Sequence, residues 1–170
     1  MPAAHGRYSK AAGFTLLEIL VVVLIIGVLS AVFLLSVDSN REEKGKHEAQ
    51  RFAALMKLAG QEAMLRSREL AVEIFPDGYR FLVSEEQQWQ PLEDDILTPQ
   101  QLPEGMSLLL QFDGADVAWA DAQEVEAPRI YLLSTGEMTP FELTLLIEGL
   151  DYSYRVNGGV SGKLGFSEQR

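Results

Sequence analysis

Apolar residues are gathered in one long run near the start of the chain. Residues 19–37 contain no charged side chain, and a helix over residues 14–37 has a length of roughly 36 Å at 1.5 Å per residue. This length exceeds the hydrocarbon core of a bilayer, which is about 30 Å thick. The run therefore predicts a transmembrane helix over residues 14–37. Arg7 and Lys10 precede it, so the positive-inside rule places the N-terminus in the cytoplasm.

Beyond residue 37 the chain becomes polar, and apolar residues then recur at helical spacing. The spacing predicts that an amphipathic second half of the same helix covers residues 38–70, because no proline occurs between Pro2 and Pro76. Gly45 is expected to weaken this helix. The expected buried stripe consists of Phe52, Leu55, Met56, Ala59, Ala63 and Met64.

From residue 71 the apolar period changes from 3.6 to 2, which indicates strands. About seven or eight short strands are expected over residues 71–170, in two packed antiparallel sheets or in one strongly curved sheet. Turns are expected at three groups of residues, namely Pro76 to Gly78, Ser134 to Glu137 and Asn157 to Gly159. The fold class is therefore α+β, with the long helix covering one face of a sheet.

The composition restricts the chemistry that this chain can perform. The 170 residues carry a formal charge of −11, and they include no cysteine and two histidines. Disulfides and cysteine-based zinc sites are excluded, and an acidic chain is not expected to bind nucleic acid. No nucleophile–base constellation stands out, so neither an enzyme nor a cofactor is predicted.

The junction between the polar leader and the apolar run carries the strongest local signal. It reads Gly13, Phe14, Thr15, Leu16, Leu17, Glu18. A carboxylate costs about 2.5–3.5 kcal/mol at the centre of a membrane helix and less near its end, so Glu18 calls for an explanation. Three interpretations compete: a secretory signal peptide, a plain signal anchor, and a prepilin-type signal that is cut before the apolar run.

These six residues resemble the processing motif of type IV pilins and type II secretion pseudopilins. The resemblance implies a pilin-like fold, and it implies that a prepilin peptidase removes residues 1–13 by cutting after Gly13. It also implies that the new N-terminal residue, Phe14, is N-methylated. Glu18 would then pair with the Phe14 amine of a neighbouring subunit and set the register of a filament. Removal of the leader changes the formal charge from −11 to −13, because residues 1–13 carry Arg7, Lys10 and no acid.

A second resemblance covers the C-terminal part of the chain. Residues 133–143 and the glycine-rich residues 157–165 are similar to the ending of the protein H family of minor pseudopilins. The resemblance implies a subunit near the tip of a type II secretion pseudopilus that helps to export folded proteins across the outer membrane. The implied partners are other minor and major pseudopilins, the prepilin peptidase, secreted substrates, the secretin and inner-membrane lipid. The β-domain would be periplasmic. The alternative is a minor pilin of a type IV pilus.

Acidic residues are concentrated in residues 85–128, which also hold four of the seven prolines. Oxygen-rich clusters of this kind can bind calcium, but the spacing matches no EF-hand loop, and charge runs more often form a solvated surface. No metal site is therefore predicted. The stretch is long for a hairpin connection, and it is expected to be a mobile or extended loop that contacts partner subunits.

Overall fold

The computed structural model describes residues 15–117 and 127–169, apart from the side chains of residues 31–39. It comprises two compact units, residues 1–38 and 39–170. Helix α1, Leu16–Leu65, contributes to both units, and all the strands belong to the second. The order of one long helix followed by strands confirms the predicted α+β class.

Helix α1 ends five residues before the predicted boundary at residue 70. Ser67 adopts a left-handed conformation with φ of 50°. The Arg68 N–H donates to the Ala63 carbonyl at 3.1 Å, and the Ser67 N–H donates to the Met64 carbonyl at 3.3 Å. This pair of bonds is a Schellman motif, which closes a helix C-terminus. Leu70, placed in the helix by the sequence pattern, is instead the first residue of a strand.

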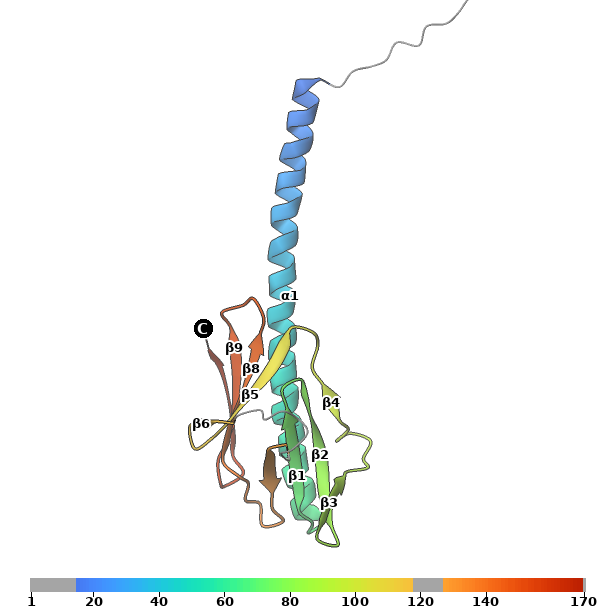
Figure 1. Ribbon diagram of the computed structural model, residues 1–170, viewed down its shortest axis with the longest axis vertical. Helices are drawn as coiled ribbons and strands as arrows, with labels where there is room; N and C mark the ends of the chain where they lie inside the picture. The colour runs from blue at the N-terminus through green and yellow to red at the C-terminus, as the bar shows by residue number, and fades with distance from the viewer. Residues whose placement is uncertain (1–14, 118–126, 170) are drawn as a thin grey trace, which may run out of the picture. The chain divides into compact units, whose positions relative to one another are not determined.

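The strands form two antiparallel sheets. In Figure 1 the sheets lie side by side, with β1 and β2 in front of α1 and with β8 and β9 to its left. One sheet has the order β3-β2-β1-β7, with β4 also paired to β2. Its strands are β1 Leu70–Phe75, β2 Gly78–Glu85, β3 Gln88–Pro91, β4 Gln100–Gln101 and β7 Arg129–Leu132. The other sheet has the order β10-β9-β8-β5-β6. Its strands are β5 Met106–Phe112, β6 Ala115–Asp116, β8 Phe141–Ile147, β9 Ser153–Gly158 and β10 Leu164–Gln169.

The described residues thus contain ten strands rather than seven or eight, because β4 and β6 are two-residue strands without an alternating pattern. Two of the predicted turns are found where expected, between β1 and β2 and at residues 134–136. The third is displaced, since Asn157 and Gly158 belong to β9. That hairpin turns instead where the Gly159 N–H donates to the Lys163 carbonyl.

Part of the acidic stretch 85–128 is built into the sheets as strands β3, β4, β5 and β6. Strand β5 lies between β6 and β8 in its sheet, and Leu97 and Leu110 are 1% and 0% exposed. The expected loop is therefore wrong for strands β3, β5 and β6. Residues 92–99, in contrast, connect β3 to β4 without helix or strand, and the buried side chains of Leu92 and Leu97 anchor this connection to the core. Residues 118–126 lie outside the described part of the chain.

The core lies between the C-terminal part of α1 and both sheets. The Phe52 ring meets Tyr79 of β2 edge-on at a centroid distance of 4.9 Å, and it meets Phe141 of β8 at 6.2 Å. The helix therefore covers both sheets, whereas the sequence pattern predicted that it covers one face. Four of the six stripe residues are buried, but Met64 is 46% exposed.

Gly45 has a packing role rather than the weakening role that was expected. It is a buried residue within α1. A Cβ placed there would collide with the Ile147 side chain and come within 3.3 Å of the Tyr154 ring. The Tyr154 hydroxyl donates to the Glu42 carbonyl at 3.2 Å. The glycine thus allows the helix backbone to approach the second sheet closely.

Candidate functional site

The first turn of α1 contains Glu18, the residue predicted to act in assembly. Thr15 is the N-cap: its hydroxyl accepts the Glu18 N–H at 3.2 Å, and its carbonyl accepts the Ile19 N–H at 3.2 Å. Glu18 is therefore the third residue of the helix, where the positive end of the helix dipole favours a carboxylate. The Thr-x-x-Glu spacing is the sequence signature of a capping box, and it identifies Thr15 as a residue that the motif analysis did not single out.

The side chain of Glu18 is exposed, and it forms no ion pair with another described residue. Its carboxylate is thus free to meet a charge on another molecule. Gly13 and Phe14, the predicted cleavage and methylation residues, lie outside the described residues.

The large apolar side chains from Leu16 to Leu29 are all uncovered within the chain, with exposed fractions between 41% and 86%. Contiguous apolar surface of this size marks contact with lipid or with other proteins. Across the residues whose placement is described, no helical stretch is both long and apolar enough to cross a bilayer. The predicted span 14–37 also includes Phe14 and the side chains of residues 31–37, which lie outside this description.

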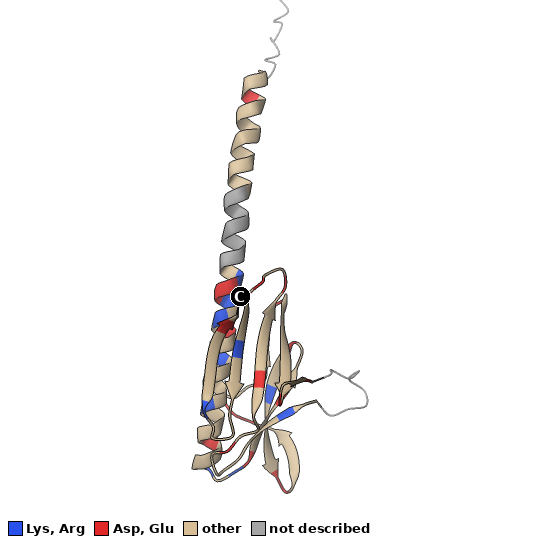
Figure 2. Ribbon diagram, turned by 90° about the vertical axis from the view of Figure 1, so that its left-hand side faces the viewer, with Lys and Arg blue, Asp and Glu red and all other residues tan. Residues whose placement is uncertain are grey.

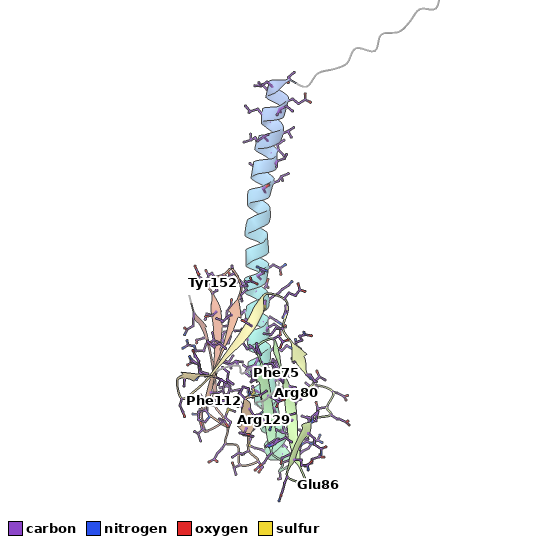
Figure 3. All side chains as sticks on the ribbon, in the orientation of Figure 1. Phe75, Arg80, Glu86, Phe112, Arg129 and Tyr152 are labelled. Carbon is purple, nitrogen blue, oxygen red and sulfur yellow. The ribbon has the colours of Figure 1, made fainter. Side chains whose placement is uncertain are left out.

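Among the described residues of the β-domain one carboxylate is buried, that of Glu73, on the face of its sheet opposite the core. Glu73 is 2% exposed and lies beside Arg80 and Arg129 in the strand register. Its Oε2 pairs with the Arg80 guanidinium, and its Oε1 accepts from Arg129 at 3.0 Å and 3.1 Å. Arg80 also lies over the Phe75 ring at 5.3 Å (Figure 3). Both carboxylate oxygens are used, so this cluster holds strands together and is not an open acid–base site.

The remaining side chains that could act in catalysis or in metal binding do not lie together. His47 is exposed on α1 and lines a shallow pocket with Lys44, Glu48 and Pro103 but no hydroxyl side chain. Thr135 accepts the Glu137 N–H within the turn after β7. Among the described residues there is no group of three or more side chains of the types that bind metal ions. The geometry therefore offers surfaces for assembly, and no catalytic constellation is formed by these residues.

Comparison with known proteins finds a family model that matches the N-terminal part of the chain and another that matches the C-terminal part. A family model described as Type II transport protein GspH matches residues 48–162. A second model, described as the prokaryotic N-terminal methylation motif, matches residues 8–34. The type II secretion system protein H of Pseudomonas aeruginosa is 32% identical over 147 residues, covering 81% of this chain and 84% of the relative. The protein H of Aeromonas hydrophila is 28% identical and covers 87% of each chain.

Solved structures show the same fold. The minor pseudopilin EpsH of Vibrio cholerae superposes with a TM-score of 0.62 at 28% identity, over 72% of this chain and 94% of EpsH. The type IV minor pilin FimU of Pseudomonas aeruginosa superposes with a TM-score of 0.51 at 13% identity, over 74% of this chain and 90% of FimU, which is a likeness of fold alone. Together with the family match over residues 48–162, these findings show that the chain belongs to the GspH family of type II transport proteins.

Proposed function

We propose that this protein is a minor pseudopilin of a type II secretion system, built into a periplasmic filament near its tip. The observation that carries the proposal is that one chain has both an N-terminal methylation motif and a GspH domain. The filament would help to export folded proteins, and the other pseudopilins and the secretin would be its partners. The likeness to FimU concerns fold alone, so it does not favour the alternative of a type IV minor pilin.

The features of the N-terminal segment support a pathway by which the subunit is processed and then enters the filament. A prepilin peptidase would cut between Gly13 and Phe14, and Phe14 would be N-methylated. Residues 14–37 would hold the subunit in the inner membrane, with the β-domain in the periplasm. The uncovered apolar side chains of Leu16 to Leu29 would pack first against lipid and then against neighbouring helices.

Glu18 would supply the charge contact between subunits. Cleavage leaves a positive amine on Phe14, and a charge moved out of water needs a partner. The Glu18 carboxylate is exposed and unpaired within the described residues, so it can accept the amine of a neighbour. If Glu18 acted only as a helix-capping residue, it would need no contact with a second subunit.

The first experiment is the intact mass and N-terminal sequence of the membrane-extracted protein, with and without a prepilin peptidase. The expected result is peptidase-dependent loss of residues 1–13 and addition of one methyl group to Phe14. A chain that keeps its leader, or one that is cut beyond residue 37, would contradict the proposal.

The second experiment tests the role of Glu18 in cells that carry the complete secretion system. Glu18→Ala is expected to lower incorporation into sheared filaments, and Glu18→Asp is expected to restore part of it. Glu43→Ala is the matched control, because Glu43 is an exposed carboxylate on the same helix. Equal incorporation of Glu18→Ala and Glu43→Ala would remove Glu18 from the assembly mechanism.

A further inference from the structure

Strand β10 leaves one edge of the second sheet open. It is the end strand in the order β10-β9-β8-β5-β6, and its six residues make it the longest of the strands that end a sheet. Phe166, Ser167 and Glu168 are exposed. Within the described part of the chain no strand pairs with the free side of β10. An unpaired strand of this length is a template on which a further strand can form.

The other sheet ends are short or covered. Strand β6 has two residues, and β3 has four and ends at Pro91, whose nitrogen cannot donate a hydrogen bond. The outer side of β7 is occupied, because the Tyr131 N–H donates to the Thr139 hydroxyl at 3.1 Å and the Thr139 N–H donates to the Tyr131 carbonyl at 2.9 Å. These features protect three sheet ends from pairing and leave β10 without such protection.

The β9–β10 hairpin determines which backbone groups of β10 face outward. The Gly159 N–H donates to the Lys163 carbonyl at 3.0 Å, so these two residues form a hydrogen-bonded pair. Antiparallel pairs alternate between hydrogen-bonded and non-hydrogen-bonded ones. The residues of β10 that bond to β9 are therefore Gly165, Ser167 and Gln169. The residues that direct their N–H and C=O groups to the free side are Leu164, Phe166 and Glu168.

The side chains of the outward-facing residues leave an apolar ring beside the open edge. The Phe166 ring stacks on the Tyr154 ring at a centroid distance of 6.1 Å, and Phe166 remains 37% exposed. Glu168 is the only charged residue of β10, and it pairs with Lys46 of α1. Strand addition combines backbone hydrogen bonds, which give affinity, with side-chain contacts, which give specificity. Both are available here.

Charge has little part in selecting what binds this edge. Strand β5 has no charged residue, and β8, β9 and β10 have one each, so these strands are mostly tan in Figure 2. An extended polypeptide presents free N–H and C=O groups at the spacing of the edge. A helix uses these groups in its own hydrogen bonds. The backbone of β10 therefore selects a strand.

We propose that β10 pairs with an edge strand in the β-domain of a neighbouring pilin-like subunit, through the outward backbone groups of Leu164, Phe166 and Glu168. An apolar side chain of the partner covers Phe166. A strand already held in a folded sheet loses less conformational entropy on pairing than a flexible segment does. The identity of the partner rests on the proposed function, because it is taken to be another subunit of the filament.

The test uses the full-length protein in cells that carry the complete secretion system. A photo-cross-linking amino acid replaces Ser167 of β10, and in a control strain it replaces Gln88, an exposed residue of the short edge strand β3. Mass spectrometry of the cross-linked peptide is expected to identify a strand of another pilin-like subunit from the Ser167 position only. The absence of a cross-link from Ser167 would overturn the proposal, as would a peptide from a helix, from this same chain, from a secreted protein or from the secretin.

A matched pair of variants tests the backbone contact. Glu168→Pro and Glu168→Ala both remove the ion pair with Lys46, but only the proline also removes the outward N–H. Neither removes a hydrogen bond to β9, because the backbone of Glu168 faces the free side. Glu168→Pro is expected to lower the cross-link yield by at least about fivefold relative to Glu168→Ala, as the loss of one hydrogen bond predicts. Equal yields would overturn the proposal.

A second pair at the other end of the strand repeats the comparison. Leu164→Pro is expected to lower the yield relative to Leu164→Ala for the same reason, and circular dichroism establishes that each variant is folded. If a proline at one position prevents folding, the pair at the other position decides.

Filament incorporation and secretion measured in the same cells separate this inference from the proposed function. If the unmodified chain enters the filament but the proline variants cross-link as their alanine counterparts do, the strand-pairing proposal fails and the proposed function stands. If the unmodified chain is absent from the filament, the proposed function fails first and the partner of β10 fails with it.

Discussion

The ring of Phe52 on α1 meets the ring of Tyr79 on β2 edge-on, with their centroids 4.9 Å apart. Phe52 is 2% exposed and also touches Phe141 of the second sheet, so one side chain joins the helix to both sheets. Burial among these groups also raises the pKa of the Tyr79 hydroxyl. The contact between α1 and the sheets therefore depends strongly on this position.

We expect Phe52→Ala to lower the free energy of unfolding by about 3–5 kcal/mol, because it removes a large buried ring and leaves a cavity. Chemical denaturation of the protein measures the loss. Phe166→Ala is the control, because Phe166 is 37% exposed and its removal should cost much less. Equal losses for the two variants would show that Phe52 does not join the sheets to the helix.

The second prediction concerns the buried carboxylate of Glu73 and its two arginine partners. Glu73→Ala is expected to lower the free energy of unfolding by about 3 kcal/mol, because removal of one member of a buried ion cluster leaves its partners poorly compensated. The partial exposure of Arg80, 46%, limits the loss. The control Glu142→Ala breaks a partly exposed ion pair with Arg155, in which each side chain is 33% exposed, and it should cost less than about 1 kcal/mol. A loss for Glu73→Ala no larger than that of the control would contradict this account.

The sequence indicated the elements that have a regular period, and it missed the features that depend on tertiary contacts. The alternation of β8, Phe141–Ile147, is visible in the chain and is found in the structure. Glu73 lies in an alternating strand at a position that appears solvent-exposed from sequence alone. In the structure its carboxylate pairs with Arg80 and with Arg129, which is 56 residues away, and no local sequence pattern predicts the pairing with Arg129.

Helix boundaries show the same limit. The sequence pattern extended α1 to residue 70 because no proline occurs before Pro76. The helix ends earlier because Ser67 takes the left-handed position that glycine usually occupies. At the other end, Thr15 and Glu18 have the capping-box spacing, so that signal was available in the chain. The assembly residues Gly13, Phe14 and Glu18 were identified by family resemblance, and their roles remain predictions.

The third prediction concerns the dependence of stability on pH through Asp94. Its carboxylate accepts the Leu97 N–H at 2.9 Å and the Ile96 N–H at 2.8 Å, and these bonds hold the pKa of Asp94 below its usual value. A lowered pKa in the folded state adds stability above the unfolded pKa, which is near 3.9 for aspartate. That contribution is lost as the pH falls through the lower, folded pKa.

Asp94→Asn keeps an oxygen acceptor at every pH, so it serves as the reference. We expect the native protein to lose up to about 1 kcal/mol of stability relative to Asp94→Asn as the pH is lowered from 6 to 3, since the partly exposed carboxylate accepts two backbone hydrogen bonds in a local turn. Thermal melting across this range measures the difference. A constant difference between the two proteins would show that protonation of Asp94 does not affect folding.

The last prediction compares the same substitution at two glycines of one helix. Alanine is favoured over glycine inside a helix by about 1 kcal/mol, so Gly60→Ala, where a Cβ meets no neighbour, should raise the free energy of unfolding by up to that amount. Gly45→Ala should lower it, by about 1–3 kcal/mol, because the new methyl group collides with Ile147 and displaces the helix from its sheet. Chemical denaturation of both variants measures directly whether each substitution raises or lowers the free energy of unfolding. If Gly60→Ala were destabilising, contacts within the chain would need that glycine.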